Sequence, residues 1–410
     1  MGGPSGPAAD RPPAPTANVS LPPGYPRPIL PDRRLQQPQR PLPRFFPPSG
    51  RRRTPTGCEA ADFLPYARRR WPRRTRSYRP EATYRPELLA RHGLPRPATV
   101  DDLAAALGVT VGKLKWLTWP VATGRWGRLG GGPDHYVRRE LPKRSGGKRL
   151  LRVPKPETRR TQDWILREIL SRVPVNPCAH GFRPGRSILT NARQHAGKEL
   201  VVNLDLEDFF PRISFATVDG VFECLGYPQE VAWCLAMLCT CRYGRRWRRA
   251  LPQGAPTSPA LANLVCWKLD RRLTGLAGKF GAAYTRYADD LTFSGDGDFI
   301  RGLERFLPLL GRICAEEGMR LNAAKTRFMR RCHRQEVTGL VVNDRPGLTR
   351  RERRVLRAIL HNCRTRGAVS QNHTGDPLFR QRLRGRIALV RMVHPQQAER
   401  LEADFWAVEW

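Results

Sequence analysis

Acidic residues are scarce in this sequence. Its 410 residues include 36 Asp and Glu against 73 Lys and Arg, giving a formal net charge of +37. Such an excess of cations argues against an enzyme that acts alone on a small molecule. It favours a polyanionic partner, with nucleic acid ahead of an acidic membrane surface. Because 40% of the residues are hydrophobic, a buried core is expected and wholesale disorder is excluded.

Long apolar runs, an export signal and paired cysteine motifs are also missing. The longest stretch without a charged residue, Ala250 to Trp267, contains three prolines, whereas a membrane span needs about 20 mostly apolar residues. The first residues have neither the cationic nor the apolar region of a signal peptide. The ten cysteines include no CxxC pair. We therefore expect a cytoplasmic protein with reduced thiols and no membrane partner.

The N-terminal segment differs in composition from the rest of the chain. Fifteen of the 39 prolines lie within the first 50 residues, and Gly, Arg and Gln fill much of the remainder. Such a segment buries too little apolar surface to offset its ordering entropy. Residues 1–78 are therefore predicted to be a disordered, Pro/Arg-rich arm. The arm is either a solubilising tail or a basic segment that contacts phosphates.

After this arm the pattern predicts helices and strands in mixed order. Helices are expected at 100–107, 111–116, 158–173, 215–225, 230–238, 258–276, 299–317, 350–362, 377–392 and 396–405. Strands are expected on either side of the Gly146-Gly147 turn, at 200–206, in a hairpin over 282–294, and at 326–329 and 337–342. The order and the antiparallel hairpins predict an α+β fold.

Three aspartates interrupt apolar strands. Asp205 lies within a buried strand, and Asp289 and Asp290 lie between the two apolar runs of the hairpin. A carboxylate in such a place is costly unless it is paired or holds a cation. Asp205 and Asp289 are expected to meet on neighbouring strands of one sheet face. Oxygen ligands without His or Cys favour two Mg²⁺ ions, or Mn²⁺, as an in-line phosphoryl displacement requires. In isolation, Asp289-Asp290 would be typical of a solvated turn.

A second feature lies between these acids, at Leu251 to Pro259. Gly254 is expected to permit a close backbone approach to a ligand, and Ser258 and Pro259 are predicted to begin a helix. A helix N-terminus beside a metal site suits a nucleotide or a template backbone. An ordinary loop-to-helix junction is the alternative.

Together these motifs resemble those of reverse transcriptases, in order, from about residue 140 to 345. The resemblance implies a right-hand polymerase with a helical N-terminal region (79–136), fingers (137–199), a palm holding the catalytic site and part of the fingers (200–343), and a small helical thumb (344–410). The segment from Asp205 to Phe210 is similar to the motif with the first metal-binding acid, and Tyr287 to Asp290 to the signature box. Asp205, Asp289 and Asp290 would be the catalytic, metal-binding residues.

The resemblance also implies a set of nucleotide-binding residues. Phe210 falls at the position whose aromatic ring excludes a ribose 2′-OH, which would select deoxynucleotides. Gln253 and Gly254 match the motif that contacts template and incoming nucleotide. Lys325 matches the lysine near the triphosphate, and Arg149 would meet phosphates from the fingers. A solvated hairpin is the alternative for Arg149.

Two short motifs are similar to those of bacterial retron reverse transcriptases. Asn191 and His195 fit the NAxxH pattern, and Val337, Thr338 and Gly339 form the VTG triplet. The resemblance implies that these residues take part in recognition of the retron RNA. Either alone also fits a surface histidine or a strand end.

A retron enzyme would copy its own structured non-coding RNA from dNTPs. Priming from a 2′-OH of an internal guanosine would give branched, RNA-linked single-stranded DNA (msDNA) and an RNA–DNA hybrid, which the arginine-rich thumb would grip by phosphate contact. The resemblance further implies a bacterial host, a role in anti-phage defence and an effector protein as a possible partner. Alternatives are a group II intron-type or other bacterial reverse transcriptase, an untemplated DNA synthase of the same fold, and a non-catalytic RNA-binding protein.

Overall fold

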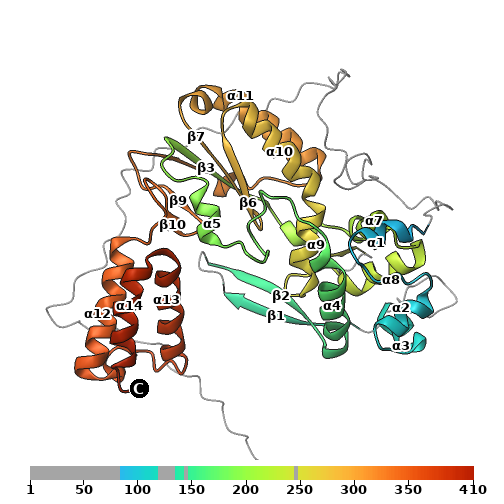
Figure 1. The fold of residues 1–410 in the computed structure, drawn as a ribbon, viewed down its shortest axis with the longest axis horizontal. Coiled ribbons are helices and arrows are strands. Elements are labelled where there is room, and N and C mark those ends of the chain that lie inside the picture. The colour runs from blue at the N-terminus through green and yellow to red at the C-terminus, as the bar shows by residue number, and fades with distance from the viewer. Residues whose placement is uncertain (1–83, 119–133, 143–145, 244–247) are drawn as a thin grey trace, which may run out of the picture. The chain divides into compact units, whose positions relative to one another are not determined.

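The computed structural model describes residues 84–118, 134–142, 146–243 and 248–410. The chain divides into two units, 1–62 and 63–410, and all the described residues belong to the second. The predicted arm, 1–78, lies outside the described residues. Helices and antiparallel strands alternate in mixed order, so the α+β prediction is confirmed (Figure 1). No helix in the described ranges is long and apolar enough to cross a membrane.

Three short helices begin the described part: α1 (Pro86–Arg91), α2 (Val100–Ala106) and α3 (Val111–Thr118). Thr99 caps α2 as predicted. Its side chain accepts a hydrogen bond from the Asp102 N–H, and the Asp102 carboxylate accepts one from the Thr99 N–H. This reciprocal pair satisfies two of the N–H groups that a helix start leaves open.

The predicted hairpin around Gly146-Gly147 is formed by β1 (Tyr136–Pro142) and β2 (Lys148–Pro154), which pair antiparallel. The helix predicted at 158–173 is α4 (Pro156–Glu168) followed by the 3₁₀ turn η3 (Leu170–Arg172). A further helix, α5 (Ile188–Arg193), begins at the capping residue Ser187.

A four-stranded antiparallel sheet with the order β6-β7-β3-β8 lies at the centre of the fold. Its strands are β3 (Leu200–Asp205), β6 (Ala283–Tyr287), β7 (Asp290–Gly295) and β8 (Arg327–Arg330). Side chains alternate between the faces of a strand. Leu200, Val202 and Leu204 therefore join the large helical core, whereas Val201 joins a second core on the other face. Asp205 is an odd-numbered residue of β3 and belongs to the face of Val201.

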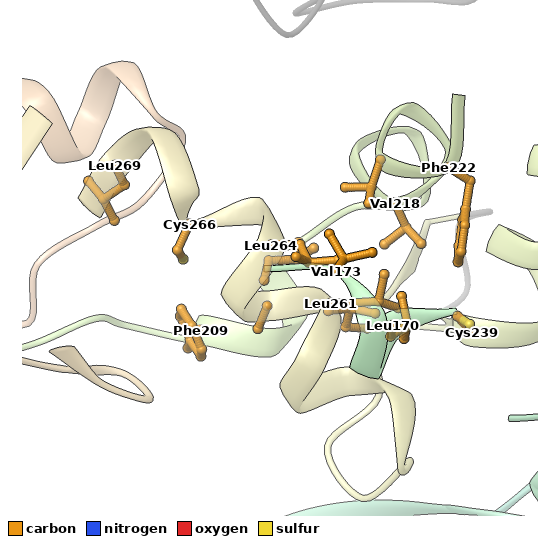
Figure 2. Packing of buried hydrophobic residues seen from close by; sticks show 14 of the residues in the cluster. Leu170, Val173, Phe209, Val218, Phe222, Cys239, Leu261, Leu264, Cys266 and Leu269 are labelled. Atoms are coloured by element: carbon orange, nitrogen blue, oxygen red, sulfur yellow. The ribbon is translucent and has the colours of Figure 1, made fainter. Parts of the chain in front are cut away.

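Between β3 and β8 the described residues form six helices: α6 (Phe209–Arg212), α7 (Phe215–Leu225), α8 (Gln229–Cys239), α9 (Thr257–Val265), α10 (Trp267–Lys279) and α11 (Gly297–Glu316). Of these, α7, α8 and α11 were expected as single helices and α6 was not. Between them, β4 (Cys241–Arg242) pairs with β5 (Arg249–Ala250). The single helix predicted at 258–276 is wrong, because the chain breaks at Cys266 into α9 and α10. Figure 2 shows buried side chains from these helices packing with Leu170 and Val173.

The C-terminal part contains η4 (Ala323–Lys325), the short strands β9 (Glu336–Val337) and β10 (Leu340–Val341), α12 (Arg350–Arg366), η5 (Ala368–Ser370), α13 (Phe379–Val393) and α14 (Pro395–Trp406). The predicted capping box of Thr349 and Glu352 begins α12. Leu356, Ile387 and Phe405 pack together with Val201 and Val337 in the second core. The last three helices are therefore tied to the sheet by buried apolar contacts.

Candidate active site

The three aspartates meet at one end of the central sheet. Asp205 lies directly opposite Asp290 on the paired strands β3 and β7, and Ala288 and Asp289 form the two-residue turn between β6 and β7. The partner expected for Asp205 was Asp289, and this expectation is wrong by one residue. Asp289 instead touches the strand through its backbone, since its carbonyl accepts the Leu206 N–H at 3.0 Å. Because side chains alternate between the two faces of a strand, a one-residue shift in register moves a side chain from one face of the sheet to the other.

The carboxylates differ in burial but influence one another electrostatically. Asp205 is 8% exposed, Asp289 is half-buried and Asp290 is exposed, so the expectation of three buried acids holds for Asp205 alone. Partial burial, followed by repulsion from Asp289 and then Asp205, raises the pKa of Asp290 to about 6. Partial burial also comes first in raising the pKa of Asp289, with Asp205 adding to it.

One cation already contacts this group. The Lys325 ammonium donates a hydrogen bond to Asp205 Oδ1 at 2.8 Å, and this contact is the first cause of the raised pKa of Lys325. The lysine side chain is 59% exposed, so it can leave this carboxylate without disturbing a core. The carboxylates thus form a site that favours the binding of a cation.

The three carboxylates suit Mg²⁺ although they do not supply all the ligands of the ion by themselves. Within the described ranges, no three Asp, Glu, His or Cys side chains are arranged to hold one ion by themselves. Mg²⁺ in polymerase-type sites is held by one or two carboxylates, with waters and substrate phosphates completing its octahedron. The opposed Asp205 and Asp290, with Asp289 beside them, supply oxygen ligands of that kind.

A buried ion pair supports the turn from the other face of the sheet. Arg286 and Asp270 are both fully buried, and the guanidinium donates to both carboxylate oxygens at 2.8 and 2.7 Å. Arg286 Nη1 also donates to Asn263 Oδ1 at 3.0 Å and to the Ala288 carbonyl at 3.2 Å. Ala288 has φ of 60°, an uncommon conformation for a residue other than glycine. The bond from Arg286 holds this turn in place.

The loop before α5 packs against the same turn. The Gly181 carbonyl accepts a hydrogen bond from Asn263 Nδ2 at 3.0 Å, and a Cβ at Gly181 would lie 2.6 Å from the Ala288 nitrogen. The next residue, Phe182, is 46% exposed and has φ of 59°. Its ring centroid is 6.3 Å from that of Phe210.

Phe210 is half-buried on α6, where it also contacts the ring of Phe209 at 5.3 Å. Asp208, which precedes α6, has φ of 50°. This left-handed residue reverses the chain direction directly after β3. Phe210, in the segment that follows Asp205, therefore forms an aromatic pair with Phe182 of the loop before α5.

The Gln253–Gly254 segment is fixed to the β1–β2 hairpin. The Gln253 carbonyl accepts the Arg152 N–H at 2.8 Å, and a Cβ at Gly254 would lie 3.1 Å from the Arg152 carbonyl oxygen. The close approach predicted for Gly254 is thus made by the protein's own backbone. Ser258 is not the N-cap of α9, which begins at Thr257. Its hydroxyl donates to the Pro252 carbonyl at 2.7 Å and braces the loop.

Arg149 is exposed on β2 of the same hairpin. It lies near enough to Asp289 to lower that residue's pKa, against the larger effect of burial. The hairpin therefore brings a cation to the carboxylates.

The two short motifs lie together, away from the three aspartates. Asn191 and His195 are fully buried, so neither offers an atom for direct RNA contact. The His195 ring bonds to Ser294 Oγ and Thr285 Oγ1, each at 2.7 Å, and burial followed by nearby His180 lowers its pKa to about 3. This neutral histidine joins α5 to strands β7 and β6.

In the VTG triplet, Val337 is buried, whereas Gly339 is exposed and Thr338 half-buried in the turn between β9 and β10. Thr338 has φ of 48°, and its hydroxyl donates to the Ile188 carbonyl of α5 at 3.2 Å. A β-branched residue with positive φ is strained. The hairpin tip is therefore held against the helix of the other motif.

Several residues of this site escaped the sequence reasoning. A buried Arg286 paired with Asp270 has no local signature, because the two lie 16 positions apart on different elements. A signal was available for Phe182, since a Gly-Phe-Arg-Pro-Gly segment predicts a tight turn that exposes its aromatic residue.

Comparison with known proteins agrees with this geometry. The family model described as reverse transcriptase (RNA-dependent DNA polymerase) matches residues 141–355. The chain therefore belongs to the reverse transcriptase family and is an RNA-directed DNA polymerase. Within this family the chain belongs to the retron reverse transcriptases.

The relatives that support this placement come from two bacteria. The retron Mx65 reverse transcriptase of Myxococcus xanthus is 42% identical over 93% of this chain and 86% of its own length. The retron Mx162 reverse transcriptase of the same organism is 38% identical, over 80% and 71%. The retron Ec86 reverse transcriptase of Escherichia coli is 35% identical, over 66% and 79%.

Proposed function

We propose that this chain copies a cognate structured non-coding RNA into DNA at the site formed by Asp205, Asp289 and Asp290. The supporting observation is the pairing of Asp205 with Asp290 across β3 and β7, with Asp289 in the adjoining turn. These carboxylates would hold two Mg²⁺ ions, or Mn²⁺. Bound there, such ions would supply activation of the primer hydroxyl and stabilisation of the leaving pyrophosphate. The hydroxyl oxygen joins the α-phosphorus of a dNTP as the bond to pyrophosphate breaks.

The chain's own side chains would position the nucleotide. Lys325 and Arg149 lie close enough to the carboxylates to influence their pKa values, and both would bind phosphates of the incoming dNTP. The Phe210 ring would exclude a ribose 2′-OH. Gln253 and Gly254, braced by Arg152 and Ser258, would contact the template and the nucleotide. Orientation of the reactants and stabilisation of charge supply much of the rate acceleration of a phosphoryl transfer.

We further propose a retron reaction for the protein. Priming from a 2′-OH of an internal guanosine would yield msDNA, a branched RNA-linked single-stranded DNA, with a role in anti-phage defence and a possible effector protein as partner. The N-terminal helical region (79–136) would be followed by fingers (137–199), a palm (200–343) and a thumb (344–410). The last three parts would enclose the RNA–DNA hybrid. Thumb arginines would contact its phosphates. Thr338 and Gly339, in the turn of the β9–β10 hairpin, would touch RNA, whereas the buried Asn191 and His195 would act from within the protein.

The first test compares templates. RNA recovered from the purified protein is transcribed anew and supplied with dNTPs and Mg²⁺, in parallel with an arbitrary primed RNA. We expect DNA synthesis on the recovered RNA and a product that a debranching enzyme cleaves at a 2′–5′ linkage. Equal use of both templates would favour an intron-type enzyme, and synthesis without template would contradict copying altogether.

The second test addresses the rival in which the chain only binds RNA. Asp289→Asn should abolish synthesis while RNA affinity stays within about twofold, because the turn keeps its shape and one acceptor oxygen. Asp298→Asn is a matched control, since Asp298 is an exposed carboxylate on α11 paired only with Arg301 among the described residues. Continued synthesis by Asp289→Asn would show that the site is assigned wrongly.

A further inference from the structure

A pocket of about 370 Å³ lies where β10 meets the first turns of α12 and α14. It is separate from the three aspartates. Its polar side chains come from four arginines, one histidine, one glutamine and one threonine: Arg334, Arg345, Arg350, Arg353, His394, Gln397 and Thr349. None of the described residues that line it is acidic. The volume falls at the lower end of the range for small-ligand pockets, which suits a single phosphate with its sugar.

Two helix N-termini open into this pocket. Thr349 is the N-cap of the 17-residue α12, and His394 is the N-cap of the 12-residue α14; both line the pocket. A helix N-terminus carries a partial positive charge, although the Thr349–Glu352 capping box already uses N–H groups of α12 and Pro395 of α14 has none. The two dipoles therefore add to the charge of the arginines.

The arginines keep donors available for a ligand. Arg353 Nη1 donates to Gln397 Oε1 at 2.9 Å, while its Nε is buried without a hydrogen-bond partner. Within the part of the chain that the structure describes, Arg345 and Arg350 form no ion pair. A buried guanidinium N–H without an acceptor costs free energy, which an anion in the pocket would recover.

The acids in the neighbourhood are already engaged. Glu336 lies 3.6 Å from Arg334, Glu352 accepts hydrogen bonds from the Thr349 N–H and hydroxyl, and Asp344 pairs with Arg331 at 3.1 Å. Glu336 and Glu352 offset part of the positive charge, at Arg334 and at the α12 N-terminus, whereas Arg345, Arg350 and Arg353 have no acidic partner among the described residues.

The pocket is also held in one shape. Val341 and Gly347 exchange two backbone hydrogen bonds at 2.8 and 2.9 Å, which close the loop between β10 and α12. The Leu348 N–H donates to His394 Nε2 at 3.3 Å, and a Cβ at Gly347 would lie 3.6 Å from that nitrogen. A preformed site avoids ordering its loop on binding.

We propose that this pocket binds one backbone phosphate of the structured RNA, with Arg353, Arg345 and the two helix N-termini as its donors. The proposal rests on the proposed function and identifies where the RNA partner is gripped. RNA is favoured over a free nucleotide by position, because Val341 belongs to the β9–β10 hairpin whose turn presents Thr338 and Gly339. If an RNA strand lies along that turn, the phosphates of its neighbouring nucleotides would reach the pocket.

The test measures affinity for the RNA recovered from the purified protein over a range of salt. Arg353→Lys keeps the charge but loses the planar fork, and we expect about tenfold weaker binding. Arg305→Gln is the matched control, because Arg305 is exposed on α11 and lines no part of the pocket. We expect it to bind as the wild type does.

The salt dependence separates one shared phosphate from independent surface contacts. If Arg345 and Arg353 hold the same phosphate, the double variant Arg345→Gln/Arg353→Gln lowers the slope of log K against log salt by about 0.7 to 0.9, the value for one phosphate. A decrease twice as large, or wild-type affinity of Arg353→Lys, would overturn the proposal. Thermal unfolding of each variant confirms that it is folded.

Two further measurements keep the outcomes distinct. Displacement of the RNA by dTTP from wild type, but not from the Arg353→Lys variant, would reassign the pocket to a free nucleotide and overturn the proposal. DNA synthesis by wild type on the same RNA tests the proposed function separately. If wild type makes DNA while the pocket variants bind normally, only the pocket assignment fails.

Discussion

The ion pair beneath the catalytic turn gives the sharpest prediction for stability. Arg286 and Asp270 are both fully buried, and two hydrogen bonds of 2.8 and 2.7 Å join them. Asp270→Asn leaves the guanidinium buried without a counter-charge. Breaking a buried pair from one side costs about 3–5 kcal/mol, a large share of the 5–15 kcal/mol typical of a folded protein. We expect the free energy of unfolding to fall by that amount.

The same change should disturb catalysis, because Arg286 also donates to the Ala288 carbonyl of the turn that carries Asp289. Displacement of a reacting group by about 1 Å can cost 10²-fold in rate. Urea unfolding followed by circular dichroism measures stability, and dNTP incorporation on a primed RNA measures activity. Asp298→Asn, which removes an exposed partner of Arg301, should leave both almost unchanged.

A second variant distinguishes lost charge balance from lost packing. Asp270→Leu combined with Arg286→Met removes both charges, so it should recover at least half of the stability that Asp270→Asn loses. It should not restore synthesis, since Arg286→Met removes the group that donates to the Ala288 carbonyl. The reasoning is refuted if Asp270→Asn lies within about 1 kcal/mol of wild type, or if the double variant is the less stable of the two.

Three further predictions concern the active site. Phe210→Val should raise incorporation of ribonucleotides relative to deoxynucleotides by about tenfold or more; an unchanged ratio in single-nucleotide kinetics would remove Phe210 from sugar selection. Gly181→Ala should lower synthesis by about 10²-fold, because its Cβ would lie 2.6 Å from the Ala288 nitrogen; full activity would mean that the loop yields freely. Burial, followed by repulsion from Asp289 and Asp205, raises the pKa of Asp290 to about 6. When the pH rises to about 6, Asp290 loses its proton, and the ionised carboxylate destabilises the fold that holds no metal ion. Asp290→Asn should therefore stabilise the ion-free protein by roughly 1 kcal/mol at about pH 8 and hardly at all near pH 4, after allowance for solvent screening; urea unfolding without divalent ions would contradict this if the gain were equal at both.

Local patterns predicted most of the secondary structure. The helix that begins after Thr99, the capping box at Thr349, the hairpin around Gly146-Gly147 and the apolar strand predicted at Leu200 to Leu206 are all present. These features depend on neighbours in the sequence, which is why periodicity and capping rules find them. The one expected helix that is wrong, 258–276, carries an apolar pattern through the break at Cys266.

The acids of the site could be named from the sequence because a carboxylate inside an apolar strand has a cost that demands an explanation. Which of them face each other could not. Strand register is set by hydrogen bonds between segments far apart in the chain, and here it pairs Asp205 with Asp290 and leaves Asp289 in the turn.

The sequence by itself determined the alternation of helices and strands, the cationic character of the chain and the identity of its candidate metal-binding acids. Only the tertiary structure decided that His195 lies buried between Ser294 and Thr285, that Arg286 supports the turn, and that Arg353 faces a pocket beside two helix N-termini. The first set follows from interactions between near neighbours. The second arises from long-range packing, which decides whether a polar side chain is paired inside the protein or left available to a ligand.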